Sequence, residues 1–385
     1  MFEAKLNRRT IRATIGDPAH WTIEAARARA RELAALVDKG IDPRDESKRQ
    51  QQEREAERAR QQAAQACALD VWREYCEERR RAWGELHYAD HIRHARPPGQ
   101  LARSGKGTLP AGPLHDLLNR PLSRLDAAAV ESWAAKHAAE RPTVARLCLR
   151  LLSVFLNWCR AHPDYRHAMP EGNPAKSKTA HEQLGKPKAK DDALLRDQLR
   201  PWFEAARQQD PVVSAYLQAL LLTGARPGEL LRLTWSDVDF QWKSLTIRDK
   251  VEGERVIPLT PYVAALLAAL PRRGPYVFMS GKADGPIASP NHAAARVCTL
   301  AGVPPVTLHG LRRSFKSLSE WVEVPVGVVA QIMGHKPSAT AEKHYTVRPL
   351  DLLAKWHVKI EAWILEQAGI EAPSAEAVAR LRVVA

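Results

Sequence analysis

The spacing of apolar and polar positions predicts helices over most of the chain. Between residues 126 and 161, apolar side chains recur three and four apart, which predicts one apolar face on a helix. They are Leu147, Leu151, Val154, Phe155 and Trp158. Similar spacing predicts helices within 67–95, whereas the Pro, Gly and Ser residues of 96–113 predict a loop. We therefore expect a helical domain at 67–175.

The pattern becomes mixed from residue 192 onward. Helices are predicted near 196–208, 211–223, 261–269, 290–301, 309–321 and 326–332. Two short strands are predicted at 244–248 and 255–259, with a turn at Glu252-Gly253. The expected fold class is mainly α with a small antiparallel β-sheet (α+β), and 192–385 forms one domain.

The first 45 residues predict one short strand around Thr10–Ile15 and a helix that begins after Thr22. A lone strand and helix bury little surface, so we expect an incomplete domain at 1–45. Residues 46–66 are charged, Gln or Ala almost throughout, which predicts a solvated helical linker; its arginines could instead follow a DNA backbone. Lys-rich residues 176–191 predict a second linker.

The amino-acid composition limits which kinds of binding partner and which cellular compartment we expect. The 385 residues carry a formal net charge of +14, which favours a polyanionic partner such as nucleic acid. The five cysteines are scattered without a C-x-x-C pair, so we expect reduced thiols rather than disulfides or structural zinc. The N-terminus lacks a secretory pattern and no apolar run approaches a membrane span. We expect an intracellular protein without membrane contact.

Two further patterns do not predict ligand sites. The stretch Ser104–Thr108 (SGKGT) departs from the G-x-x-x-x-G-K-[ST] phosphate loop, so we expect no ATP site. His87, His91 and His94 stand at helical spacing, but without a Glu or Cys partner they predict a solvated helix face rather than a metal site. We expect no cofactor and no metal.

Candidate chemistry gathers in the second half of the chain. Arg226 follows the strongly apolar stretch 212–222 and precedes Pro227, a favoured first residue of a helix. Glu229 lies three residues later, where it can orient the guanidinium. His309 and Arg312 share one helical face, and a planar guanidinium suits two phosphate oxygens.

His335 and Tyr345 follow within a short distance along the chain. A free phenol titrates near ~10, so a tyrosine that attacks phosphorus must lose its proton, and His309 is a candidate acceptor. Each pattern alone is common on ordinary surfaces. Their order along the chain predicts one site that grips a phosphate and attacks it with a tyrosine.

Three boxes make the chain resemble the tyrosine recombinases, or lambda-type phage integrases. They read TGARPGELLRLTWSDVD, LHGLRRSF and IMGHKPSATAEKHY, in order across about 180–370. The resemblance implies a recombinase catalytic domain at 192–385. It implies that Arg226 and Arg312 clamp the scissile phosphate, that His309 and His335 complete its contacts, and that Tyr345 is the nucleophile. Lys250 lies in the predicted hairpin where the family keeps its lysine general acid, although Lys243 is nearby.

The resemblance extends to the first half of the chain. Thr14-Ile15-Gly16, Ala26-Arg27 and Gly40–Arg44 resemble the end of the arm-type DNA-binding domain in prophage and genomic-island integrases, so 1–45 is expected to be a truncated version of it. The helical block 67–175 then corresponds to the core-binding (SAM-like) domain.

The resemblance implies an enzyme that cuts and rejoins double-stranded DNA through a 3′-phosphotyrosyl intermediate, without metal or ATP, and so integrates or excises a mobile element. The alternatives are relaxation of DNA in the manner of topoisomerase IB, and a DNA-binding protein of integrase descent that no longer cuts. Expected partners are attachment-site DNA and accessory DNA-bending or excision factors. The expected location is the bacterial cytoplasm, at the nucleoid.

An amphipathic stripe follows the tyrosine within 351–367. Its members are Leu353, Trp356, Ile360, Trp363 and Ile364. The stripe can pack on the chain's own core or, as in relatives, dock on a neighbouring protomer. We expect the second arrangement, in a homotetramer on DNA joined through this C-terminal helix.

Overall fold

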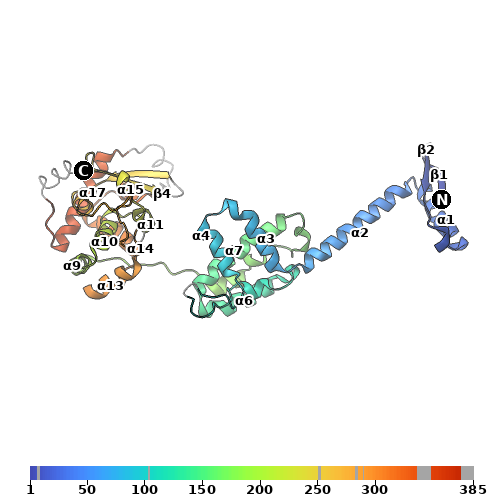
Figure 1. Cartoon of the computed structure of the whole chain (residues 1–385), viewed down its shortest axis with the longest axis horizontal. Coiled ribbons are helices and arrows are strands. Elements are labelled where there is room, and N and C mark those ends of the chain that lie inside the picture. The colour runs from blue at the N-terminus through green and yellow to red at the C-terminus, as the bar shows by residue number, and fades with distance from the viewer. Residues whose placement is uncertain are drawn as a thin grey trace. The chain divides into compact units, whose positions relative to one another are not determined.

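The computed structural model describes residues 1–6, 9–102, 105–249, 253–281, 285–288, 290–335 and 348–373. The chain forms two compact units, Met1–Lys188 and Ala189–Ala385. Figure 1 shows the elements of each unit. No helix in these described ranges is long and apolar enough to cross a lipid bilayer.

The first unit begins with a hairpin where a single strand was predicted. Strand β1 (Phe2–Leu6) pairs antiparallel with β2 (Arg9–Ala13), with Phe2 opposite Ala13. Helix α1 (Ile23–Asp38) lies against β1, and Thr22 caps it as predicted, accepting a bond from the backbone N–H of Ala25. The prediction of one strand was wrong, because β1 is as short as β2 and its own alternation, with Phe2, Ala4 and Leu6 on one face, was not recognised.

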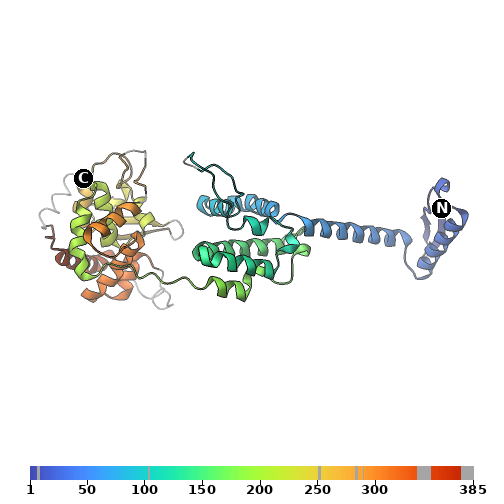
Figure 2. The ribbon, with the colours of Figure 1, turned by 90° about the horizontal axis from the view of Figure 1, so that it is seen from below.

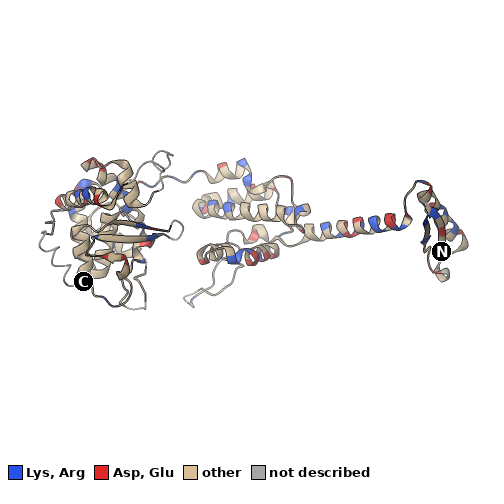
Figure 3. Ribbon diagram, turned by 90° about the horizontal axis from the view of Figure 1, so that it is seen from above, with Lys and Arg blue, Asp and Glu red and all other residues tan. Residues whose placement is uncertain are grey.

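Helix α2 (Pro43–Gln65) confirms the helix predicted for the charged segment. Asp42 caps its first turn, and most of its side chains are exposed. Figure 3 shows both signs of charge along this helix. Several opposite charges lie three or four residues apart, such as Arg49 with Glu46 and Glu53, so part of its positive charge is neutralised internally.

A helical bundle follows, as predicted for 67–175. Leu151 and Phe155 of the predicted apolar face are buried, but Val154 is 53% exposed, so the prediction that it belongs to this face was wrong. Its helices are α3 (Ala68–Arg79), α4 (Glu85–His94), α5 (His115–Leu118), α6 (Ala127–Glu140), α7 (Pro142–Ala161) and α8 (Lys178–Leu184). Trp72 and Phe155 meet edge-to-face in this core, with ring centroids 5.1 Å apart. Figure 2 shows α3 and α4 on one side of the bundle and α6 and α7 on the other.

Two local expectations for this unit differ from the structure. The Lys-rich stretch predicted as a linker contains α8, which packs on α6 and α7 by burying Ala180 and Leu184. The predicted solvated histidine face is wrong, because His91 and His94 are only 1% and 5% exposed. His91 stacks on Trp83 at 4.1 Å, and burial lowers the pKa of His91.

The second unit is helical around a small sheet. The sheet has the order β3-β4-β5 and is antiparallel. Its strands are β3 (Val238–Asp239), β4 (Ser244–Asp249) and β5 (Gly253–Pro258). The helices are α9 (Leu199–Arg207), α10 (Pro211–Thr223), α11 (Pro227–Leu231), α12 (Pro261–Ala268), α13 (Asn291–Ala301), α14 (Leu308–Ser319), α15 (Val326–Met333) and α17 (Leu350–Ala368). The six predicted helices and both predicted strands are confirmed.

Helix α10 organises the core of this unit. Every residue from Ser214 to Thr223 is buried, so the helix is covered on all sides. Helices α9, α12 and α14 pack on it, and α14 carries His309 and Arg312. The turn after α10 is therefore held between packed elements.

The C-terminal helix α17 packs on its own unit. Leu353, Ile360 and Ile364 of the predicted stripe are buried in the core, and Trp356 and Trp363 pack partly buried against it. The helix contacts β5 and α9. The stripe itself was predicted correctly, but the structure shows the arrangement in which it covers the chain's own core. Assembly through this helix stays a prediction.

Candidate active site

The turn after α10 holds Arg226 in place. Gly224 adopts φ +61°, and a Cβ atom on it would lie 2.4 Å from the ring of Phe315. Arg226 is the N-cap of α11. Its backbone N–H donates to Oε2 of Glu229 at 2.9 Å, and its Nη1 donates to Oε1 at 2.7 Å. Glu229 thus orients the guanidinium, as the three-residue spacing predicted.

Arg312 is almost fully buried on α14 and reaches back to the same turn. Its Nη1 donates to the backbone oxygen of Gly224 at 2.6 Å, and its Nη2 lies 2.9 Å from Nε2 of His335. Burial, and then the charge of Arg226, lowers the pKa of Arg312 to about 10, so it stays a cation at neutral pH.

His335 is held as a neutral ring. An arginine can only donate, so Nε2 of His335 accepts from Arg312 and the ring proton belongs on Nδ1. Burial and the positive charge of Arg312 both lower the pKa of His335. The backbone N–H of His335 donates to the oxygen of Ala330 at 2.8 Å, which fixes it against the end of α15. His335 can therefore present Nδ1–H as a donor.

His309 lies on the first turn of α14 and is exposed. Burial of part of its ring lowers its pKa, and the charges of Arg313 and Arg312 lower it further. It is therefore neutral at physiological pH and can accept a proton. His309, Arg312 and His335 line one cavity of about 530 Å³. The other residues that line it are Asp191, Ala193, Arg313, Lys316, Ser317, Glu320 and Met333.

Asp192 ties the incoming chain to α14. Its carboxylate accepts from the backbone N–H and hydroxyl of Thr307, at 2.8 and 2.6 Å, and from Arg313. Burial opposes its charge, but these hydrogen bonds outweigh burial and the pKa of Asp192 is lowered. A Cβ on Gly310 would lie 2.6 Å from the backbone oxygen of Asp192, so a glycine permits the approach.

Arg255 on β5 is a further cation of the site. It grips the carboxylate of Glu229 and reaches the backbone oxygen of Ile332. Sequence reasoning missed it, although the strand pattern held a signal. Arg255 shares a strand face with the buried Ile257, while Val256 between them is 47% exposed. A charge on the inward face of a strand is a recognisable departure from ordinary alternation.

The structure thus brings Arg226, Arg312 and His335 together. One cavity is lined by His309, Arg312 and His335. Lys250 and Tyr345 lie outside the described residues, so their predicted roles stay predictions. Lys243 precedes β4 at the end of the strand opposite the β4–β5 turn. Among the described residues, no group of three or more His, Cys, Asp or Glu side chains is arranged to hold a metal ion.

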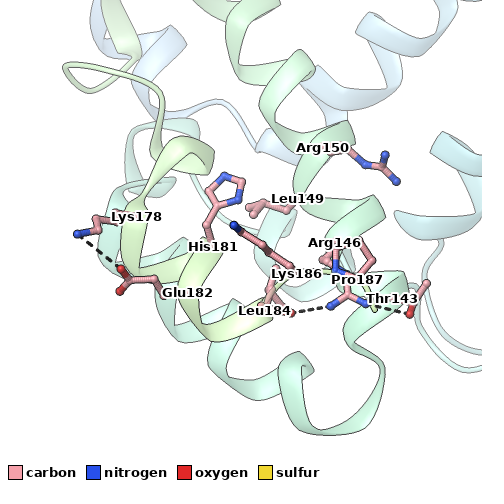
Figure 4. Close-up of a pocket in the computed structure, with 11 residues that line it drawn as sticks. Thr143, Arg146, Leu149, Arg150, Lys178, His181, Glu182, Leu184, Lys186 and Pro187 are labelled. Carbon is pink, nitrogen blue, oxygen red and sulfur yellow. Dashed lines mark hydrogen bonds and ion pairs between the residues drawn. The ribbon is translucent and has the colours of Figure 1, made fainter. Parts of the chain in front are cut away.

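A second cavity, of about 540 Å³, lies in the first unit between α7 and α8. Figure 4 shows its lining, with Arg146, Arg150, Lys178 and Lys186 among the labelled side chains. Arg146 closes one side by donating to the backbone oxygen of Leu184 at 2.7 Å. The lining combines apolar side chains, such as Leu149 and Leu184, with four basic side chains, of which Lys178 is paired with Glu182. This excess of positive charge suits a polyanion.

Three family models match the chain in order. They are an arm DNA-binding domain over residues 1–50, a phage integrase core-binding domain over 67–182, and the phage integrase family over 193–349. Prophage integrase IntF of Escherichia coli (strain K12) is 44% identical over 387 residues, covering 96% of this chain and 83% of that protein. Tyrosine recombinase XerC of Mycobacterium sp. (strain KMS) is 26% identical over 253 residues, covering 60% of this chain and 81% of that protein.

Solved structures share the fold. A lambda integrase dimer bound to a COC' core site superimposes with a TM-score of 0.55 at 16% identity, covering 85% of this chain and 89% of that chain. The Tn1549 transposon integrase (aa 82-397) in complex with circular intermediate DNA gives a TM-score of 0.53 at 14% identity, covering 74% of this chain and 97% of that chain. At such identities the likeness extends to the fold alone.

Proposed function

This chain belongs to the phage integrase family of site-specific tyrosine recombinases, and we propose that its strand-cleaving site consists of six residues. They are Arg226, Lys250, His309, Arg312, His335 and Tyr345. In this proposal the site cuts and rejoins double-stranded DNA through a 3′-phosphotyrosyl intermediate. The outcome is integration or excision of a mobile element.

The observation that carries the proposal is the crowding of guanidinium groups at the turn after α10. Arg226 and Arg312 approach the same turn, and the charge of Arg226 helps to lower the pKa of Arg312. Arg226 and Arg255 share the carboxylate of Glu229, so the group of three cations keeps a net positive charge. An anion placed between Arg226 and Arg312 would relieve their repulsion, and a phosphodiester has the size and charge to do so.

The proposed step is an in-line displacement at phosphorus. The Tyr345 oxygen bonds to phosphorus while the bond from phosphorus to the 5′ oxygen breaks. His309 accepts the phenol proton, and Lys250 gives a proton to the leaving 5′ oxygen. Arg226, Arg312 and the Nδ1–H of His335 stabilise the charge on the non-bridging oxygens.

The covalent product explains how strands can be exchanged. A phosphotyrosyl ester replaces one phosphodiester with another bond of similar energy. A different 5′ hydroxyl can therefore attack it and release Tyr345 without nucleotide hydrolysis. The arginines provide the positive charge that metal ions provide in many other phosphoryl-transfer sites.

The test uses nicked suicide duplexes that span the ends of the mobile element carrying this gene. Cleavage releases a short strand and traps the protein on DNA. We expect a covalent adduct with the wild-type chain and none with Tyr345→Phe. An adduct that persists in the phenylalanine variant, or no wild-type adduct on any such duplex, contradicts the proposal. Relaxation of plasmids that lack these sites would indicate topoisomerase activity instead.

DNA outside the cleavage point is proposed to contact the basic side chains that line the cavity between α7 and α8 and the lysines that follow it. The net charge of +14 and the exposed Lys186 and Lys188 support contacts to the phosphate backbone. The relatives of known structure include integrases bound to DNA. Binding of this kind would place the protein at the nucleoid and let accessory DNA-bending or excision factors act beside it.

Assembly on DNA is proposed to be a homotetramer. A lambda integrase has been solved as a dimer on a core site and as a tetramer on a Holliday junction. Because the apolar stripe of α17 is buried in its own unit, we assign the contact between protomers to the outer face of α17, where Leu352 and Val358 are exposed. Cross-linking on a synthetic four-way junction tests this, since Leu352→Glu together with Val358→Glu should remove the tetramer but leave binding to one site.

A further inference from the structure

We propose that Arg255 is a positioning residue that locks Arg226, the turn before His335 and the β4–β5 hairpin into one arrangement. The inference rests on the proposed function, since it concerns how the same phosphate site is held in shape. Arg255 does not line the cavity of His309, Arg312 and His335. It acts through the residues that it contacts.

The first contact is to the carboxylate that orients Arg226. Arg255 Nη2 donates to Oε2 of Glu229 at 2.7 Å, and its Nη1 donates to Oε1 at 3.3 Å. Arg226 donates to the same two oxygens, through its Nη1 to Oε1 and its backbone N–H to Oε2. Each oxygen of Glu229 therefore accepts from both arginines.

This sharing sets where the Arg226 guanidinium comes to rest. The Glu229 side chain is only 4% exposed, so water cannot replace a missing donor easily. Burial opposes its charge, but the hydrogen bonds from Arg255 and Arg226 outweigh burial and lower the pKa of Glu229. Without Arg255, Arg226 would be the remaining arginine that donates to the Glu229 carboxylate. The guanidinium would then be drawn toward Glu229 and away from the phosphate.

The second contact is to the turn that carries His335. Arg255 Nε donates to the backbone oxygen of Ile332 at 3.3 Å. Gly334 has φ +73°, and a Cβ atom on it would lie 2.7 Å from Cζ of Arg255. Arg226 Nη2 donates to the Gly334 oxygen at 3.4 Å, so both arginines hold this turn. His335 follows directly and meets Arg312 at 2.9 Å.

The third link is the hairpin itself. Arg255 is paired with Ile247 across the β4–β5 ladder, and the ladder ends at Asp249 opposite Gly253. Lys250 follows Asp249 in the chain, so the strand that leads away from the proposed general acid is fastened to Glu229. A planar guanidinium can donate hydrogen bonds to Glu229 and to the Ile332 oxygen at the same time, whereas a lysine ammonium cannot match that geometry.

The test is a double-mutant cycle on the rate of covalent adduct formation in a single turnover on nicked suicide DNA. Arg255→Leu should lower this rate about 100-fold, because small misplacement of a catalytic group has costs of this size. In an Arg226→Ala background, followed over a longer time course, the same change should lower the rate by no more than about threefold, because its main target is already gone. A residue with only a structural role would reduce the rate by the same factor in both backgrounds.

Arg248→Leu is the matched control. Arg248 lies on the neighbouring strand of the same hairpin and also forms an ion pair, at 2.7 Å, but with Asp237. It should leave the adduct rate within about threefold of wild type, because Arg248 contacts Asp237 rather than Glu229 or the turn before His335. Arg255→Lys is the second variant, which keeps the charge and should show the same non-additivity with a smaller loss of rate.

Thermal unfolding of each variant separates folding from positioning. If Arg255→Leu unfolds, the Arg255→Lys cycle decides the question. Equal factors in the two backgrounds, or a wild-type rate in both Arg255 variants, would overturn the inference. Failure of the proposed function looks different, since the wild-type chain itself would then form no adduct that depends on Tyr345.

Discussion

The roles of individual residues in this site are set by the groups to which they are tied. The spacing of His309 and Arg312 predicted a shared helical face, and both line the same cavity. The spacing did not predict that Arg312 would be buried between a backbone oxygen and His335 while His309 stays exposed. Burial depends on the elements that cover a helix, and local spacing carries no information about them.

The contact between Glu229 and Arg255 was outside the reach of sequence reasoning for a related reason. The two residues stand 26 positions apart, on α11 and β5, and nothing in either local pattern refers to the other. By contrast, the pair of Arg226 and Glu229 is three residues apart, and the spacing alone predicted it. Short-range pairs can be predicted from one sequence, and contacts between distant elements need the fold.

Arg312→Lys tests the two-pronged role of that guanidinium. A lysine can keep the charge, but one ammonium cannot donate to both the Gly224 oxygen and His335 in the same geometry. We expect adduct formation to slow by about 100-fold or more, the size of effect seen when an oxyanion donor is removed. Single-turnover cleavage of suicide DNA measures this. Arg296→Lys is the control, because Arg296 makes a two-pronged contact with Gln209; if both variants slow equally, the effect is not specific to the phosphate site.

Gly334→Ala tests the approach of Arg255 to the turn before His335. The backbone at position 334 has φ +73°, a conformation that alanine rarely adopts. The new Cβ would also lie 2.7 Å from the Arg255 guanidinium. Gly302→Ala is the matched control, because Gly302 has φ +65° and nothing within 4 Å of the added atom. The left-handed backbone alone should cost each variant about 1–2 kcal/mol in free energy of unfolding. The close contact with Arg255 should add to this loss in Gly334→Ala.

Only Gly334→Ala should also slow adduct formation, by about 10-fold or more, since it displaces a group that positions the site. Chemical denaturation and single-turnover cleavage give the two quantities. Equal cleavage rates in the two alanine variants would show that the contact with Arg255 has no functional weight.

At the scale of elements, apolar periodicity predicted the helices of the second unit to within a few residues. It failed where an element offers few apolar positions. Helix α8 buries Ala180 and Leu184 within a Lys-rich stretch, so composition indicated a linker. For α17 the stripe was correct, but periodicity could not say which surface would cover it.

Helix α17 carries two buried titratable groups whose effects on stability oppose each other. His357 is fully buried and its Nε2 lies 2.9 Å from the Leu222 oxygen; burial lowers the pKa of His357 to about 4. Glu361 accepts from Thr260 and from two backbone N–H groups at the start of α12, and burial raises the pKa of Glu361 to about 7.

The pH dependence follows from these shifts. The folded pKa of His357 is below its ordinary value of 6.5, so the unfolded chain binds more protons and stability falls as pH drops from about 6.5 toward 4. The folded pKa of Glu361 is above its ordinary value of 4.5, so its contribution is fully present below that value and is lost as pH rises through about 7. Between about 4.5 and 6.5 the two slopes have opposite signs.

Glu361→Gln should therefore make the free energy of unfolding fall more steeply on acidification from pH 6.5 to 5 than in wild type, by up to about 1.4 kcal/mol per pH unit. Urea denaturation at the two pH values measures this. Glu366→Gln, on the exposed side of the same helix, should leave the slope unchanged. A wild-type slope in Glu361→Gln would mean that the carboxyl does not titrate in this range.

At the scale of the whole molecule, composition predicted a polyanionic partner but not the surface that meets it. The excess positive charge is spread along the chain, and in α2 part of it is neutralised by acids three or four residues away. The segment 185–190 is different, since it is exposed and carries lysines. The net charge cannot distinguish basic side chains that have acidic neighbours from those that do not. That distinction requires the positions of the acidic side chains in the structure.

Replacement of Lys186 and Lys188 by Gln should reduce the salt dependence of DNA binding. Each lysine that neutralises one phosphate contributes about 0.9 to the slope of log affinity against log salt concentration, so we expect the slope to fall by about 2. Fluorescence anisotropy between about 50 and 200 mM salt measures it. Replacing Arg49 and Arg60 by Gln is the control, because both have acidic neighbours in α2. An equal change in the two double variants would show that position along the chain does not matter.

The anchor at Asp192 has a mechanical consequence. The chain that enters the second unit is hydrogen-bonded to Thr307, the N-cap of α14, and to Arg313 on α14, only a few residues after the first unit ends at Lys188. A force applied along this segment would therefore act on α14, the helix that carries Arg312, before it acts on most of the hydrophobic core. In the proposed complex, tension on DNA bound to the first unit would reach α14 along this connection. Strand cleavage in this protein should accordingly respond to force applied to the DNA, in a direction set by the bond between Asp192 and α14.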